Sequence, residues 1–153
     1  MVYQEKILRL GYENSKDDQL QAIQDIVNDT GFPVQLLIQD RIDKDYWENA
    51  AIVLSKLGSP RIDCIIPSLL EWVEDLNWPG ALIITGLLYS LPKKELEGPV
   101  TDALEQATIQ HRKRWYKNLT WLFVERDIHE SNVLKDIEQQ KEILKDYFGE
   151  IYP

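Results

Sequence analysis

Cysteine is nearly absent from the sequence. Cys64 is the one cysteine among 153 residues, which excludes an intrachain disulfide and the paired cysteines of zinc ribbons and redox motifs. We therefore expect the chain to work in a reducing compartment. Because Cys64 lies in an apolar run with Ile62, Ile65 and Ile66, we expect a buried structural thiol rather than a nucleophile.

Motifs for catalysis and metal binding are also lacking. The chain has two histidines, and although Glu125 and His129 stand four residues apart, they leave a zinc site without its third ligand. The oxygen-rich stretch 40–48 lacks the order of an EF-hand loop, and no phosphate-binding or nucleophile motif occurs. The sequence thus predicts no catalytic residue, no metal and no cofactor, and the balance is against an enzyme.

Basic residues are few compared with acidic ones. Seventeen Lys and Arg residues stand against 26 Asp and Glu residues, a formal net charge of −9. Such a charge repels nucleic acid and anionic membranes and attracts a basic protein, although an acidic surface also serves solubility alone. The expected partner is therefore another protein, basic in one version, and neither a membrane nor a nucleic acid.

Apolar runs are too short for a membrane span. The longest uncharged stretch, which includes residues 78–92, falls below the length of about 20 residues that a spanning helix needs. The N-terminus shows no secretory signal pattern. We therefore predict a cytoplasmic protein.

Apolar residues as such are plentiful, and they recur at helical spacing. The chain is 44% hydrophobic and has five tryptophans, enough for one core at this length. We predict a single all-α domain over residues 1–153, with an N-terminal extension at 1–14 and stacked helix pairs at 15–148. About seven or eight helices are expected.

Turn and capping signals set the expected helix boundaries. Ser15 resembles an N-cap, with Asp18 three residues later. Pro67 marks either the start of a helix or a kink in it, Pro79 fits the first position of a central helix whose faces are all apolar, and a further helix is entered through Gly98 and Pro99. The expected helices cover residues 15–28, 34 to about 40, 46–57, 60–76, 78–91, 97–107, 111–124 and 131–148.

Parts of the sequence repeat loosely. Residues 50–55 (Ala-Ala-Ile-Val-Leu-Ser) match residues 80–85 (Gly-Ala-Leu-Ile-Ile-Thr) in character, and Trp47, Trp78 and Trp115 each stand near the start of an expected helix. We interpret residues 46–57, 78–91 and 115–124 as corresponding inner helices. The pattern predicts a short HEAT-like α-α superhelix, whereas the tetratricopeptide pattern does not occur.

Two blocks of the sequence carry a resemblance to a known family. They are W-x-N-A-A at residues 47–51 and W-x-x-D-x-N-W-P-G-A at residues 72–81, with an aromatic segment at 114–121. In these the chain resembles an uncharacterised bacterial family of small HEAT-like domains of unknown function. The resemblance covers roughly residues 15–124 and implies the fold but no activity.

The second block contains the first group of candidate partner-binding residues. Trp72, Asp75, Asn77 and Trp78 place two indoles, a carboxylate and an amide at one interhelical turn. A structural interpretation explains each residue type, because Asp75 or Asn77 can accept hydrogen bonds from free backbone amides. The alternative is a surface patch for a partner, since Trp contributes strongly to interfaces.

The second group lies in a basic run within this acidic chain. Arg112, Arg114 and Trp115 are its candidate partner-binding residues, in a run that continues through Lys117. Because helical spacing spreads these charges around the axis, we favour solvated charges and salt bridges to the many acidic residues. The alternative is a nucleic-acid surface.

The preferred functional hypothesis is a cytoplasmic protein-protein interaction module with no catalytic activity. One version, suggested by the net charge and the small size, is an immunity-type protein that covers a basic toxin. The enzyme alternative is a HEAT-like, base-glycosylase-like protein that acts on nucleic acid through the basic aromatic helix 111–124. A purely structural subunit is a third hypothesis.

Overall fold

Helices make up all the regular structure in the computed structural model, which describes residues 2–124. Seven α-helices lie in this range, joined by three short 3₁₀ turns and followed by one π-helical turn. The all-α prediction is confirmed. The α-helices are α1 (Val2–Leu8), α2 (Lys16–Asn28), α3 (Lys44–Leu57), α4 (Ile66–Trp72), α5 (Ala81–Tyr89), α6 (Lys93–Ile109) and α7 (Lys113–Leu119). The shorter elements are η1 (Val34–Leu37), η2 (Gln39–Arg41), η3 (Asp63–Ile65) and η4 (Thr120–Val124).

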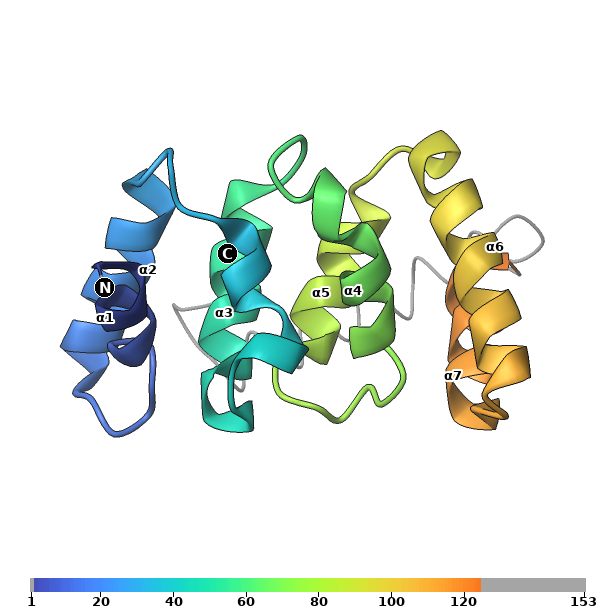
Figure 1. Ribbon diagram of the computed structural model, residues 1–153, viewed down its shortest axis with the longest axis horizontal. Helices are drawn as coiled ribbons and strands as arrows, with labels where there is room; N and C mark the ends of the chain where they lie inside the picture. Colours follow the sequence, from blue (N-terminus) through green and yellow to red (C-terminus); the bar gives the residue numbers. More distant parts are fainter. Residues whose placement is uncertain (1, 125–153) are drawn as a thin grey trace.

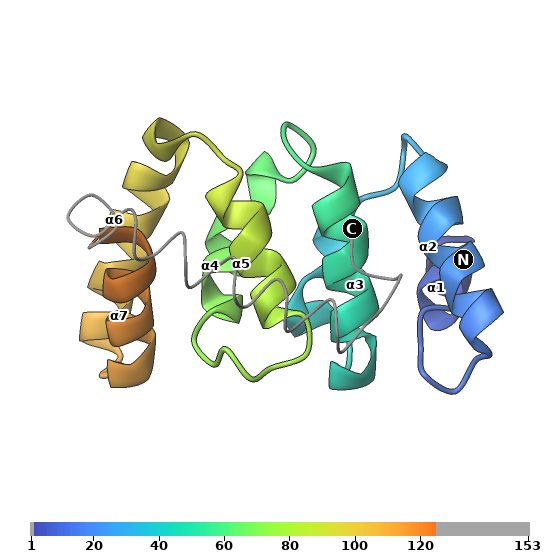
Figure 2. The same cartoon turned by 180° about the vertical axis from the view of Figure 1, so that it is seen from behind.

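The helices form two layers along the long axis of the molecule. The row begins with α1 and α2 at one end and finishes with α6 and α7 at the other, and α4 and α6 lie in front of α5 and α7 (Figure 1). The view from behind brings α3, α5 and α7 to the front (Figure 2). α3 packs against α2, η1 and α5, while α4 contacts both α5 and α6. Each step along the row therefore adds one element to each layer.

The central helix α5 is enclosed, as its apolar sequence predicts. Ile84 and Leu88 are fully buried, and even Thr85 is only 3% exposed. The Thr85 hydroxyl donates to the Ala81 carbonyl at 2.8 Å within the helix, so burying it leaves no unpaired polar group. α5 thus forms the middle of a continuous core that runs along the row.

The N-terminal end begins earlier than the sequence indicated. The Ser15 cap is confirmed, because its hydroxyl accepts a hydrogen bond from the Asp18 amide at 3.2 Å. No element was expected before it, yet α1 is a helix that buries Ile7 and Leu10, the latter just beyond its end. One buried position in a helix of seven residues, with a second just beyond its end, gives too short a period to be recognised from sequence alone.

α4 is shorter than predicted at both ends. The expected helix over residues 60–76 is a 3₁₀ turn followed by a helix over Ile66–Trp72. Of the two roles left open for Pro67, the structure selects the helix start, because its missing N–H is tolerated only in the first turn. Residues 73–76 lie outside the helix.

α5 also starts later than predicted. Pro79 is not its first residue; the helix begins at Ala81, after Gly80 with a φ of 82°. A Cβ at residue 80 would lie 2.7 Å from the Ala51 Cβ and 3.0 Å from the Trp47 carbonyl oxygen. Because the turn passes close over α3, only glycine fits at residue 80. The left-handed backbone conformation of Gly80 is not that of an α-helix, so the helix starts after it.

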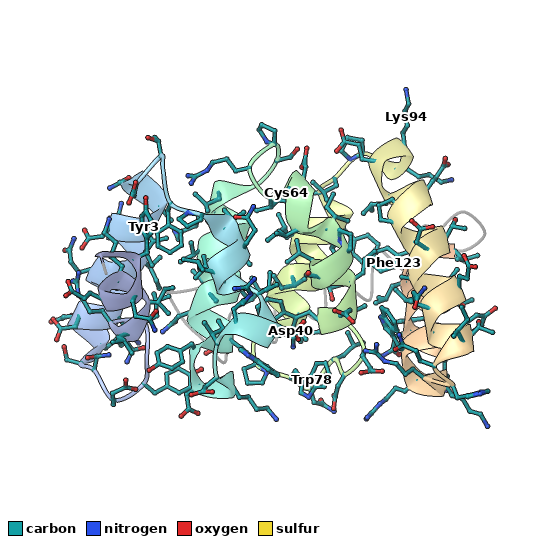
Figure 3. All side chains as sticks on the ribbon, in the orientation of Figure 1. Tyr3, Asp40, Cys64, Trp78, Lys94 and Phe123 are labelled. Atoms are coloured by element: carbon teal, nitrogen blue, oxygen red, sulfur yellow. The ribbon has the colours of Figure 1, made fainter. Side chains whose placement is uncertain are left out.

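Three further expectations are corrected. α6 begins at Lys93 and contains Pro99 in its interior, so Gly98 and Pro99 do not precede the helix. The segment after Pro33 forms η1 and η2 rather than one helix, because Ile38 between them is extended. Cys64 is exposed rather than buried, in a 3₁₀ turn near Gln35 (Figure 3).

The last described helix is shorter than the expected 111–124. It divides into α7 and the π-helical turn η4. The helix expected over residues 131–148 lies outside the described residues. Within residues 2–124 no helix is long and apolar enough to cross a membrane.

Candidate functional site

The turn between α4 and α5 is built on tryptophans that contact each other. Trp72 is fully buried, and its indole N–H donates to the Pro79 carbonyl at 3.0 Å. The Trp47 ring meets the Trp72 and Trp78 rings edge to face, with centroids 6.2 and 5.6 Å apart. In this conformation the Trp72 side chain holds the turn together and presents no surface to a partner.

The polar residues of the same turn shape its backbone. One Asp75 carboxylate oxygen accepts a hydrogen bond from the backbone N–H of Asn77 at 2.9 Å, which is the local hydrogen bond of an Asx turn. The other oxygen lies 3.5 Å from Arg114. Asn77 is exposed and Trp78 is partly exposed, so these two residues supply the accessible part of the predicted cluster.

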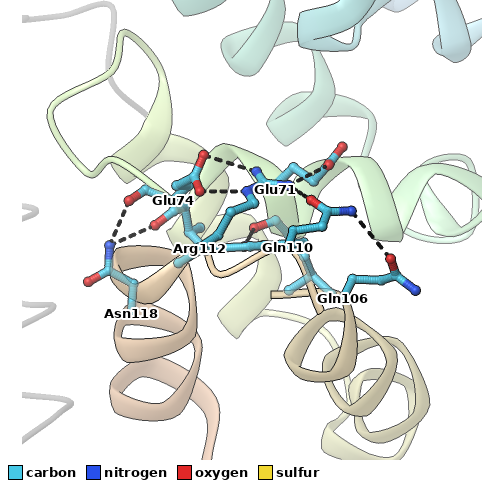
Figure 4. A network of polar contacts seen from close by, with 9 residues as sticks. Glu71, Glu74, Gln106, Gln110, Arg112 and Asn118 are labelled. Atoms are coloured by element: carbon cyan, nitrogen blue, oxygen red, sulfur yellow. Dashed lines mark hydrogen bonds and ion pairs between the residues drawn. The ribbon is translucent and has the colours of Figure 1, made fainter. Parts of the chain in front are cut away.

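Arg112 joins the start of α7 to the end of α4. Its guanidinium binds Glu74 in a bidentate manner, with nitrogen–oxygen distances of 2.7 and 2.9 Å, and donates to Gln110 at 3.0 Å (Figure 4). A longer contact of 3.4 Å reaches Glu71. The hydrogen bonds and charge of Glu74, followed by those of Glu71, raise the pKa of Arg112 against the opposing effect of burial, so Arg112 stays charged.

Two side chains of α7 bind carbonyls at and just beyond the end of α4. The Trp115 indole N–H donates to the Leu70 carbonyl at 2.8 Å, and the Asn118 amide donates to the carbonyls of Val73 and Glu74 at 2.9 and 3.0 Å. The last carbonyls of a helix have no partner within the helix. We call Arg112, Trp115 and Asn118 with residues 70–74 the α4–α7 junction.

The basic run therefore divides into residues that are bound within the protein and residues that are exposed. Arg112 and the nearly buried Trp115 belong to the junction, where the guanidinium lies 4.0 Å from the indole centroid. The Arg114 side chain is 69% exposed, and Lys113 and Lys117 are also exposed. Sequence reasoning missed Asn118, because only a fold that brings together residues 45 positions apart gives it a role.

A groove between α4 and α6 lies beside the junction. It has a volume of about 470 Å³. On the α4 side it is lined by Pro67, Ser68 and Glu71, and α6 contributes Gly98, Pro99, Asp102, Ala103 and Gln106. Gln110 and Trp115 complete the lining. Trp115 is the one predicted candidate residue that lines this α4–α6 groove.

Small residues on α6 keep the groove open. Gly98, Asp102 and Gln106 recur every four residues and so share one face of the helix. A Cβ placed on Gly98 would meet no atom within 4 Å, and Ala103 projects only a methyl group. Sequence reasoning missed this surface because it ended the preceding loop at Pro99, since glycine and proline are typical of loops.

The charge around the groove is acidic. Glu71 and Asp102 belong to opposite walls, and the lining contains no lysine, arginine or histidine. Within residues 2–124 no group of three or more potential ligands is placed to hold a metal ion. The groove can therefore attract a cation or a basic side chain, with apolar surface from two proline rings and an indole below it.

Comparison with known proteins places the chain in a family. The family model of DUF5071, a domain of unknown function, matches residues 36–146, well over half of the chain. The chain belongs to this DUF5071 family. No curated protein and no solved structure matches it. The uncharacterised family expected from the two sequence blocks is thus confirmed, and the match contains the whole α4–α6 groove and the α4–α7 junction.

The DUF5071 match begins within η1, so α1 and α2 precede it. Asn49 of the first block attaches them, because its buried amide donates to the Leu10 carbonyl at 2.7 Å and to Gln19 at 2.9 Å. Tyr12 donates to Glu48 at 3.0 Å, and burial raises the pKa of the Glu48 carboxyl. The W-x-N-A-A block therefore joins the N-terminal helices to the family domain.

Proposed function

We propose that this DUF5071 chain is a protein-protein interaction module without catalytic activity of its own, and that the α4–α6 groove is its binding surface. The supporting observation is Trp115, which lines an open groove while its indole N–H is bound to Leu70 and its ring is covered by Arg112. A surface fixed in this way loses little conformational freedom on binding. Apolar surface with a polar rim is the usual anatomy of a protein interface.

The finer parts of the proposal concern origin and partner. We propose a HEAT-like relationship, supported by the two-layered row of helix elements, and a bacterial, cytoplasmic protein. The net charge of −9 and the acidic groove rim support a basic partner. An immunity-type protein that covers a basic toxin is one such case, and an adjacent toxin gene in the native host is the observation expected for it.

The nucleic-acid alternative depends on the exposed face of α7. Lys113, Arg114, Tyr116 and Lys117 are exposed there, whereas Arg112 and Trp115 are engaged within the protein. We expect no shift of labelled DNA or RNA in an electrophoretic mobility assay at low salt, where phosphate contacts are strongest. A shift that disappears in the Lys113→Gln/Lys117→Gln variant would favour the alternative.

Gly98 allows a matched test of the groove. Gly98→Phe places an aromatic ring in it, because no atom beyond the two neighbouring residues and the backbone of α6 itself lies within 4 Å of a Cβ at this position. Gly98→Ala leaves the groove nearly unchanged and carries the same unfavourable contact between its Cβ and the ring of the following Pro99, so the two variants differ only in the aromatic ring. Circular dichroism confirms that both variants fold.

Affinity capture from the native host then compares the full-length variants. We expect one stoichiometric partner on the wild type and on Gly98→Ala, and its loss on Gly98→Phe. Recovery of no stoichiometric partner at low and moderate salt would refute the interaction module. Equal recovery on Gly98→Phe would refute the groove as its surface.

A further inference from the structure

We infer that the α4–α6 groove accepts a short protein segment and places a lysine or arginine of that segment between Glu71 and Asp102. This inference rests on the proposed function and names the chemistry of the partner. It follows from three features of the groove: the unused carboxylate oxygens, the occupied face of Trp115, and the small volume.

The two carboxylates retain capacity to bind a cation. Glu71 meets Arg112 through one oxygen only, at 3.4 Å, and its side chain remains 42% exposed. Arg112 is bound more closely by Glu74, so Glu71 is not needed to hold it. Asp102 is exposed and forms no ion pair within residues 2–124.

A basic side chain completes this charge arrangement. The two carboxylates belong to facing helices, and the groove lining contains no cation, although Arg112 beside it reaches one oxygen of Glu71. An ammonium or guanidinium group between them forms charge-assisted hydrogen bonds, which are shorter and stronger than neutral ones. An acidic segment at the same place would meet two like charges, so the rim of the groove selects segments by the sign of their charge.

The indole does not provide the cation site. One face of Trp115 is already covered by Arg112, whose guanidinium carbon lies 4.0 Å from the ring centroid. The residue is 3% exposed, which leaves an edge for apolar contact and no face for a second cation. Recognition therefore depends on the carboxylates, and lysine and arginine should both be accepted.

The volume limits the length of the segment. The groove, at about 470 Å³, has room for a few side chains. A short segment inserts these side chains, with the proline rings of Pro67 and Pro99 and the Ala103 methyl available for apolar contact.

Peptide selection on the full chain tests the inference. The probe is a phage-displayed library of random nine-residue peptides, selected on the wild type and counter-selected on Gly98→Phe. We expect the enriched peptides to share a lysine or arginine flanked by small or apolar residues. Enriched peptides without a basic residue, or no enrichment over Gly98→Phe, would overturn the inference.

Charge-removing variants test the role of the two carboxylates. Fluorescence anisotropy of the best selected peptide should give about tenfold weaker binding to Glu71→Gln/Asp102→Asn than to the wild type. Glu5→Gln/Glu105→Gln removes the same charge at exposed positions outside the groove and should change the affinity less than about twofold. Equal losses of peptide affinity in the two double variants would show that the effect comes from the net charge alone, and would overturn the inference.

The groove as the binding surface and the basic segment as its occupant can be disproved separately. If the native partner is lost on Gly98→Phe but is bound normally by Glu71→Gln/Asp102→Asn, the interaction module stands and the basic segment is wrong. If Gly98→Phe has no effect on the partner, the groove itself is wrong. Replacement of the basic residue in the selected peptide by glutamine should weaken binding to the wild type about tenfold.

Discussion

The turn between α4 and α5 and the α4–α7 junction are both built around tryptophan and polar residues, but they bury the indole in different surroundings. At the turn, Trp47 packs edge to face against both Trp72 and Trp78. At the junction, Trp115 lies between an arginine and the end of a helix and borders an open groove.

This difference arises from the neighbouring helix rather than from the tryptophans themselves. The turn passes so close to α3 that only glycine fits at residue 80. Beside the junction, α6 contacts α4 but offers the small residues Gly98 and Ala103 there, so that a groove remains between the two helices. Similar residue types in sequence thus give a closed structural contact in one place and a surface in the other.

The largest effect should follow from breaking the closed contact. Trp72→Ala removes a fully buried indole and its hydrogen bond to Pro79, which should lower the free energy of unfolding by about 3–5 kcal/mol. Urea denaturation followed by circular dichroism measures it. Trp78→Ala, at a partly exposed position, should cost clearly less, and equal costs would contradict the enclosed turn.

A smaller effect is expected at the junction. Arg112→Met leaves Glu74 without its partner, and because the two side chains are 26% and 18% exposed, solvent limits the cost to about 2 kcal/mol. Arg112→Lys keeps the charge but loses the bidentate geometry and should be intermediate. The same denaturation experiment decides, and a lysine variant as stable as the wild type would argue against the bidentate geometry.

Glu48 of α3, the helix on which the closed turn packs, allows a test by pH. Burial raises the pKa of its carboxyl above the ordinary value for glutamate, with an opposing contribution from the Tyr12 hydrogen bond. The folded chain therefore holds this proton more tightly than the unfolded chain. The stability that the proton contributes is complete below the unfolded pKa and is lost as the pH rises through the folded pKa.

Glu48→Gln cannot lose this proton. Its melting temperature relative to the wild type should therefore rise as the pH increases from about 4 to 7. The exposed Glu5→Gln serves as the control and should show no such trend. A constant difference between Glu48→Gln and the wild type over this range would show that the buried carboxyl does not titrate as described.

The smallest effect is expected for Arg114. Its side chain is 69% exposed and lies 3.5 Å from Asp75, and exposed pairs of this kind contribute little. Arg114→Ala should change the free energy of unfolding by less than about 0.5 kcal/mol. A loss as large as that of Arg112→Met would mean that the basic run acts as one unit and would remove the distinction drawn within it.

The sequence predicted those elements whose signals are local. The Ser15 cap and the periodic apolar residues of α2 and α3 require no knowledge of distant contacts. The errors fall where distant contacts decide, as at Gly80, which packs against Ala51, and at Pro99, which lies inside a helix despite its usual role as a breaker. For the groove, only Trp115 was singled out, because Glu71 and Asp102 gain meaning from the packing of α4 against α6.

Gly80 also has a mechanical consequence. A Cβ at this position would lie only 3.0 Å from the Trp47 carbonyl oxygen and 2.7 Å from the Ala51 methyl group, so the main chain at residue 80 lies close to the main chain of α3, with no larger side chain than a methyl group beside it. The α3–α5 seam should therefore be stiff. We expect bending of the row to concentrate between α4 and α6, where the groove lies and where a bound segment would connect the two helices and limit their relative motion.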